Sequence, residues 1–146
     1  MRAVDTNLLV YAHRADSSWH DAARPLIADL AEGVAAWAIP WPCIHEFLAI
    51  VTHPRIYRPP TPAPAAVAQV DAWMESPSLV LLGEATGHWQ ELRALVLAGR
   101  ADGPRVHDAR VAALCVSHGV REFWSADRDF GRFPGVPVVN PLVARG

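Results

Sequence analysis

The chain has 146 residues, of which 51% are hydrophobic and 19% charged, and its formal charge is −2 from 13 basic and 15 acidic side chains. This composition predicts a single globular domain over residues 1–146 and excludes a disordered or fibrous protein. The near-neutral charge gives no general electrostatic case for nucleic-acid binding, so a polyanion would have to meet a local patch or a bound cation.

The sequence also indicates the compartment. No stretch reaches the roughly 18 apolar residues that a membrane span needs, and the start of the chain, Met1 to Asp5, lacks the apolar core of a signal peptide. We therefore expect a cytoplasmic protein without membrane contact. Cys43 and Cys115 lie in apolar helical contexts, which favours buried free thiols over a disulfide.

In chain order, the first half alternates short apolar strands with amphipathic helices. Residues 2–4 predict a strand, and apolar spacing predicts helices over residues 8–12 and 19–30, the second ending at Gly33. A buried strand follows over residues 35–39. Pro40 and Pro42 then open a helix that ends at His53-Pro54, because proline is tolerated in a first helical turn.

The second half continues the alternation after a stiff proline-rich loop at residues 54–62. We expect a helix over residues 65–74, a strand over 79–82, helices over 84–98 and 106–118, a strand over 122–125, one irregular helical turn over 127–133 and a final strand over 136–139. In the helix over residues 84–98, Trp89, Leu92, Leu95 and Val96 should face inward, and core packing or a dimer face accounts for most of the six tryptophans. The fold class is α/β: a three-layer α/β/α arrangement with a central parallel sheet of four to five strands.

Four acidic residues fall at the carboxyl edge of this sheet. Asp5 follows the first strand, and Asp127 follows the strand before the final one. Glu46 and Asp108 lie in early turns of helices that begin at the same edge. Taken singly, each is better explained as a helix cap or a partner of the helix dipole. Together they require a cation, because two carboxylates about 5 Å apart repel by roughly 3 kcal/mol, and Mg²⁺ or Mn²⁺ prefers oxygen ligands.

The motifs around these acids are Val4-Asp5-Thr6-Asn7, Glu46, His107-Asp108-Ala109-Arg110 and Ser125-Ala126-Asp127-Arg128-Asp129-Phe130. In this order and spacing, from Arg2 to about Pro141, the chain resembles the PIN-domain nucleases, and specifically the VapC-type toxins of bacterial toxin–antitoxin pairs. The resemblance implies a PIN-like fold, an Mg²⁺-dependent endoribonuclease with Mn²⁺ as the other possible ion, an RNA substrate, a cognate antitoxin that blocks the acidic pocket, and a homodimer.

The same resemblance assigns roles to individual residues. The catalytic set would be Asp5, Glu46, Asp108, Asp127 and Asp129, with Asp5, Asp108 and Asp127 holding the metal and Asp129 supporting or sharing the ligation. Thr6, Asn7 and Ser125 would orient the acids. Position 125 is often threonine in the family, and serine keeps the hydroxyl group.

Four arginines are candidate RNA contacts. Arg55 and Arg58 flank Tyr57 in the proline-rich loop, where phosphate pairing and base stacking would combine, and Arg110 and Arg128 lie beside the acids in sequence. A solvated loop and ordinary surface ion pairs are the alternative interpretations. His45 and His107 stand next to acids, but adjacent helical residues point apart, which disfavours a catalytic role for them.

Other functions fit less well. No C-x-x-C or H-E-x-x-H spacing indicates a zinc site. An aspartyl phosphatase of the haloacid dehalogenase kind would have a second Asp two residues after the first, where this chain has Asn7. The remaining alternative is a catalytically inactive PIN fold that binds RNA or a partner, which predicts the loss of one or more acids, and here the set is complete.

Overall fold

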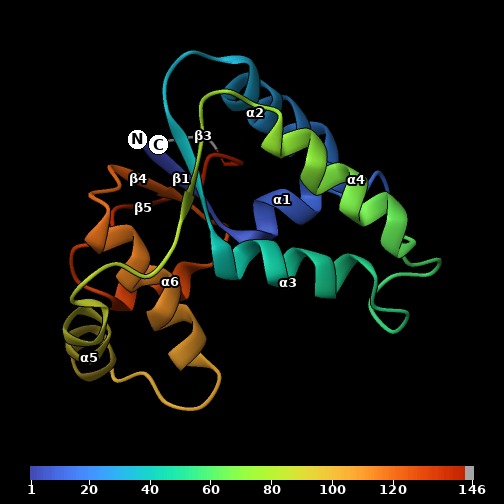
Figure 1. Cartoon of the computed structure of the whole chain (residues 1–146). Coiled ribbons are helices and arrows are strands. Elements are labelled where there is room, and N and C mark those ends of the chain that lie inside the picture. Colours follow the sequence, from blue (N-terminus) through green and yellow to red (C-terminus); the bar gives the residue numbers. More distant parts are fainter. Residues whose placement is uncertain (144–146) are drawn as a thin grey trace.

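A parallel sheet forms the centre of the computed structural model, which describes residues 1–143 (Figure 1). In the described part of the chain its strands are β1 (Arg2–Val4), β2 (Trp37–Pro40), β3 (Leu79–Leu82), β4 (Glu122–Trp124) and β5 (Val138–Val139). Their order across the sheet is β3-β2-β1-β4-β5, and every neighbouring pair is parallel. The expected parallel sheet of four to five strands is therefore confirmed.

Helices connect the strands and cover the sheet. They are α1 (Thr6–His13), α2 (His20–Glu32), α3 (Trp41–Val51), α4 (Ala63–Met74), α5 (His88–Ala98) and α6 (Arg105–Ser117), with a 3₁₀ helix over Arg128–Arg132. Figure 1 shows α5 and α6 on one side of the strands and α1, α2 and α4 on the other. This is the expected three-layer α/β/α fold. No helix within residues 1–143 is both long and apolar enough to cross a membrane.

The direction of the chain across the sheet changes beside β1. From β1 the chain adds β2 and β3 on one side, then returns to place β4 and β5 on the other side. In an open parallel sheet such a reversal leaves a crevice at the carboxyl ends of the two strands that flank it. Here the backbone N–H of Asp5, just after β1, donates to the carbonyl oxygen of Trp124 in β4 over 2.9 Å. The crevice therefore opens directly beside Asp5.

Local sequence explains how α3 is attached to this edge. Pro40 ends β2 with extended backbone angles (φ −62°, ψ 135°), and Trp41 and Pro42 begin the helix immediately afterwards. Proline has no N–H to donate, and the first turn of a helix requires none. Further along α3, Phe47 is fully buried, and its ring packs edge-on against Trp73 of α4 with the ring centroids 4.8 Å apart. The first turns of α3 are thus held at the carboxyl edge of the sheet.

Two expectations about helix α5 were wrong. Helix α5 begins at His88 rather than residue 84, because Gly87 adopts a left-handed backbone (φ 85°) that a continuous helix cannot contain. Trp89 does not face the core, since 63% of it is exposed. Core packing explains Trp37, Trp73 and Trp124, while Trp19 and Trp41 are exposed, at 42% and 40%; a dimer face over the exposed tryptophans stays a prediction.

Other expectations hold. Cys43 and Cys115 are buried free thiols. The segment after β4 forms a single short helix of the 3₁₀ type. Strand β3 is apolar in sequence, yet Val80 is 39% exposed because β3 lies at the edge of the sheet.

Candidate active site

Asp5 is the most enclosed acid at the carboxyl edge, with only 6% of the residue exposed. Its Oδ1 accepts from the backbone N–H of Thr6 (2.8 Å) and contacts the thiol of Cys43 (Sγ to Oδ1, 3.6 Å). Its Oδ2 accepts from the Ser125 hydroxyl (2.7 Å) and from the Asn7 amide (3.3 Å). The side chain is therefore held in one orientation by donors from α1, α3 and the end of β4.

The predicted supporting residues connect Asp5 to the other acids. The Thr6 hydroxyl donates to Oε2 of Glu46 over 2.9 Å. The Ser125 hydroxyl oxygen accepts from the backbone N–H of Asp127 (3.0 Å), and Asn7 Oδ1 accepts from that of Ala126 (3.2 Å). These bonds tie the start of α1 to α3 and to the loop after β4, as expected for side chains that orient the acids.

Four predicted acids line one small cavity. Its volume is about 130 Å³, and its walls are made by Asp5, Thr6, Asn7, Glu46, Ile50, Asp108, Asp127 and Phe130. The acids come from four separate parts of the chain: the segments that follow β1 and β4, the second turn of α3 and the first turn of α6. No arginine, lysine or histidine is among the described residues that line this cavity. The cavity is therefore a site of concentrated negative charge.

Burial and mutual repulsion both show in the ionisation of these acids. The pKa of Asp5 is raised to about 6, mainly by burial and also by the charge of Glu46, while the bonds from Ser125 and Thr6 oppose the shift. The pKa of Asp108 is also raised, first by burial and then by the charges of Asp127, Glu46 and Asp129. A bound cation would relieve the repulsion among these carboxylates, and carboxylate oxygens are the ligands that hard divalent ions prefer. The donor set therefore fits such an ion.

The acidic side chains do not all converge on one position where a metal ion would sit. Among the described residues, no three His, Cys, Asp or Glu side chains stand as a ready-made metal cage. Asp108 and Asp127 are only partly buried, so their side chains retain the rotamer freedom to move toward an ion. Asp129 does not line the cavity: its side chain is 59% exposed and lies 4.0 Å from the Arg105 guanidinium, while its backbone N–H donates to Asp127 Oδ1 (2.8 Å).

A larger groove adjoins the acid cavity. Its volume is about 530 Å³, and Asp5, Glu46 and Asp108 belong to its walls as well as to those of the cavity. His45 and His107 line the same groove as the acids beside them in sequence. That these histidines have no catalytic role stays a prediction.

Arg110 also lines this groove, as its position beside Asp108 suggested. Its Nη2 lies 3.3 Å from Oε1 of Glu84, in the loop after β3. Sequence reasoning missed Glu84, because the loop and α6 are separated by the whole of α5. It also missed Cys43, although Cys43 precedes Glu46 by three residues and thus shares its side of α3.

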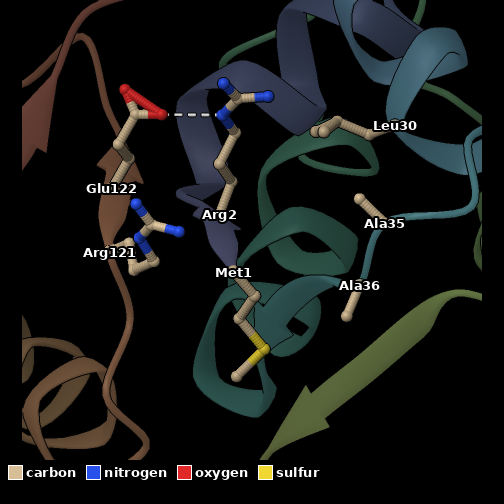
Figure 2. Close-up of a pocket in the computed structure, with 7 residues that line it drawn as sticks. All are labelled: Met1, Arg2, Leu30, Ala35, Ala36, Arg121 and Glu122. Carbon is tan, nitrogen blue, oxygen red and sulfur yellow. Dashed lines mark hydrogen bonds and ion pairs between the residues drawn. The ribbon is translucent and has the colours of Figure 1, made fainter.

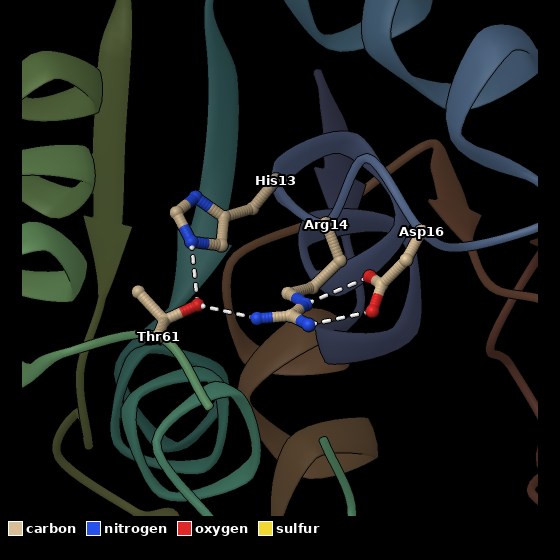
Figure 3. A network of polar contacts seen from close by, with 4 residues as sticks. All are labelled: His13, Arg14, Asp16 and Thr61. Atoms are coloured by element: carbon tan, nitrogen blue, oxygen red, sulfur yellow. Dashed lines mark hydrogen bonds and ion pairs between the residues drawn. The ribbon is translucent and has the colours of Figure 1, made fainter. Parts of the chain in front are cut away.

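The loop with Arg55 and Arg58 lies apart from the acids. It follows the carboxyl end of α3, and neither arginine lines the acid cavity or the adjoining groove. The Arg14 guanidinium covers the ring of Tyr57, 4.2 Å from its centroid. Figure 3 shows how Arg14 is fixed: it donates to both Asp16 carboxylate oxygens (2.8 and 2.6 Å) and to the Thr61 hydroxyl (3.2 Å). The Tyr57 ring is therefore part of the packing that holds this loop against Arg14. Arg128 is exposed beside Asp127.

Another hollow, of about 430 Å³, lies at the opposite edge of the sheet (Figure 2). Arg2 and Glu122, the first residues of β1 and β4, line it and form an ion pair from Nε to Oε2 over 2.6 Å. Because the strands are parallel, this hollow is separated from Asp5 by the length of the sheet. None of the predicted acids lines it.

Comparison with known proteins shows which family this chain resembles. A family model described as the PIN domain matches residues 2–136. Ribonuclease VapC48 of Mycobacterium tuberculosis is 32% identical over 138 residues, which cover 94% of this chain and 95% of that protein. Ribonuclease VapC43 of the same species is 34% identical over 142 residues, covering 97% of this chain and 96% of the relative.

Solved structures show the same fold. The crystal structure of M. tuberculosis VapC20, described as a sarcin-ricin loop cleaving toxin, superimposes with a TM-score of 0.67 at 17% identity, covering 90% of this chain and 93% of that one. VapBC2 from Rickettsia felis, bound to a DNA fragment from its promoter, gives a TM-score of 0.66 at 16% identity, covering 95% and 97%. The chain therefore belongs to the PIN-domain family. The relatives that match almost its whole length are VapC-type proteins, as the sequence motifs indicated.

Proposed function

We propose that this chain is a divalent-metal-dependent endoribonuclease that acts as the toxin of a toxin–antitoxin pair. The observation that carries the proposal is the single cavity lined by Asp5, Glu46, Asp108 and Asp127. The relatives named VapC48 and VapC43 are ribonucleases and match nearly the full length of the chain, which supports RNA as the substrate.

The carboxylates are the proposed metal ligands. Asp5, Asp108 and Asp127 would hold Mg²⁺ or Mn²⁺, with Glu46 beside them. Such an ion, when bound, acidifies a water molecule and stabilises charge on the phosphate during in-line hydrolysis. Asp129 lies outside the cavity, so we assign it a supporting role through its backbone bond to Asp127.

Neighbouring hydroxyl and amide groups hold the acids in position for this reaction. Ser125 and Thr6 hydrogen-bond the ionised form of Asp5 and so counteract the rise in its pKa that burial causes. Thr6 engages Oε2 of Glu46, which leaves Oε1 to accept a proton from an attacking water molecule. Each hydroxyl thus orients one acid without taking part in bond cleavage.

The partners follow from the same family. Structures of related proteins are described as VapBC complexes bound to DNA, from R. felis and from Salmonella typhimurium. We propose that this chain likewise pairs with a cognate antitoxin that blocks the acidic cavity, and that it forms a homodimer in the cytoplasm. Size-exclusion chromatography with light scattering, with and without co-expressed antitoxin, measures both associations.

An inactive PIN fold that binds RNA or a partner is the competing function. Total RNA incubated with purified protein in Mg²⁺, Mn²⁺ or EDTA separates the two. We expect discrete cleavage with either metal, none in EDTA, and none by Asp5→Asn. Asp21→Asn, which changes an exposed carboxylate in the first turn of α2, is the matched control and should cleave like the wild type. RNA that stays intact with both metals would refute the nuclease.

A further inference from the structure

An exposed aromatic pair stands at the start of α3. Trp41 is 40% exposed, His45 is also exposed, and their ring centroids lie 6.3 Å apart with an angle of 35° between the planes. The two residues are one helical turn apart, so their rings lie on the same side of the helix. Neither ring is used by the core or by the network that holds Asp5.

The position of Trp41 is constrained on both sides. Pro40 and Pro42 restrict the backbone around it. On the other side, a Cβ placed on Gly83 would lie only 3.6 Å from Trp41 Cδ1, so the indole edge rests against the loop after β3. That loop also carries Glu84, the ion-pair partner of Arg110. The aromatic pair and the arginine are therefore held together at one corner of the carboxyl edge.

The groove of about 530 Å³ connects this corner to the acids. Asp5, Glu46 and Asp108 line it, and so do His45, His107 and Arg110. Trp41 is not among the described lining residues, but its ring lies beside His45 at the edge of the groove. The groove therefore contains a guanidinium and two imidazoles as well as the acids. A flat aromatic surface beside a cationic group is the combination that binds a base and its phosphate in single-stranded nucleic acid.

We propose that this groove holds one unpaired nucleotide next to the phosphodiester bond that is cut, with its base stacked on Trp41 and His45 and its phosphate facing Arg110. The inference rests on the proposed nuclease function and adds a base-stacking position to it. A base within a duplex has both faces stacked on its neighbours, so only an unpaired base can lie on the aromatic pair.

The matched pair of variants is Trp41→Leu and Trp19→Leu. Trp19 is equally exposed, at 42%, but it precedes α2, whereas Trp41 stands beside the groove residues Pro42 and His45. Both changes are made in the Asp5→Asn background to prevent cleavage. Fluorescence anisotropy then measures binding of a fluorescein-labelled pool of random-sequence RNA dodecamers and of a fully paired RNA hairpin. Thermal melts establish that both variants are folded, and Trp41→Phe tests whether a smaller aromatic ring suffices.

We expect Trp41→Leu to weaken binding of the single-stranded pool about tenfold, with little effect on the hairpin, because stacking on one aromatic ring contributes about that much. Trp19→Leu should bind both probes as the parent does, and Trp41→Phe should recover most of the loss. A 2-aminopurine base in the single strand should be quenched by the parent protein and much less by Trp41→Leu.

Three results would overturn the inference. If the wild type cuts RNA but the two Trp→Leu variants bind it equally, the nuclease stands and the stacking site does not. Equal loss on the single strand and the hairpin would mean that Trp41 contacts no base. If only antitoxin capture weakens in Trp41→Leu, the groove takes a peptide. Wild-type protein that neither binds nor cuts RNA would instead remove the proposed function itself.

Discussion

Replacing Asp5 by Asn tests whether this buried carboxylate destabilises the metal-free protein. Burial raises the pKa of Asp5 from the ordinary 3.8 to about 6. As the pH rises, the unfolded chain therefore loses this proton before the folded protein does. The stability that Asp5 contributes is complete below pH 4 and is lost as the pH rises through about 6.

The size of the effect follows from the shift. A difference of about two pKa units corresponds to about 3 kcal/mol when both states are ionised at pH 8, and about 1 kcal/mol of it has already developed at pH 4.5. Asn cannot ionise, so the variant should gain about 2 kcal/mol more relative to wild type at pH 8 than at pH 4.5. The cost of turning an amide toward the donors on Thr6 and Ser125 is present at both pH values and cancels in this comparison.

Urea unfolding in EDTA at the two pH values measures the difference. Asp16→Asn is the control, because its hydrogen bond and ion pair with Arg14 lower the pKa of Asp16. The stability from Asp16 is present above its ordinary pKa of 3.8, and both pH values lie above it, so this variant should lose nearly the same stability at pH 8 as at pH 4.5. If Asp5→Asn shows the same change in stability at both pH values, the argument from burial is wrong.

Three further changes test the packing that supports the site. Gly99→Ala would place a Cβ 2.7 Å from the ring of Phe133 and should cost about 1–3 kcal/mol in a thermal melt, whereas an unchanged melting temperature would mean that the ring moves away freely. Ser76→Ala removes the acceptor of the Trp37 indole N–H (3.0 Å) and should cost about 1–3 kcal/mol in urea unfolding, against no change if water replaces the hydroxyl. Phe47→Ala empties a fully buried site between α1, α3 and α4 and should cost about 3–5 kcal/mol, and a loss below 1 kcal/mol would contradict the packing.

Apolar spacing and prolines predicted most of the fold. The strands were placed to within two residues, because each is a short apolar segment bounded by Gly, Pro or a polar turn. The start of α5 was missed by four residues. Gly87 permits the left-handed backbone that delays the start of the helix, but glycine also occurs inside helices, so its presence alone did not place the break. Trp89 was misplaced because it lies in the first turn of α5, whereas Leu95, farther along the helix, is buried.

The convergence of the acids was predictable because it follows from topology. Parallel strands end at one edge, so Asp5 and the residues after β4 had to be neighbours once the sheet was inferred. The contacts that tune the site were not predictable. The ion pair of Glu84 with Arg110 joins residues 26 positions apart. It depends on the path of the loop after β3, and that loop has no apolar periodicity from which its path could be predicted.

The two buried thiols report on different layers of the fold. Cys43 lies on α3 and Cys115 on α6, and burial raises the pKa of both, to about 12 for Cys115 and well above the ordinary value for Cys43. A disulfide reagent can reach either one only when its helix opens, so the rate of labelling measures the free energy of that opening. Because Cys43 touches Asp5, its protection also reports whether α3 stays packed against that carboxylate. Labelling both thiols in one sample would show which helical layer separates from the sheet first.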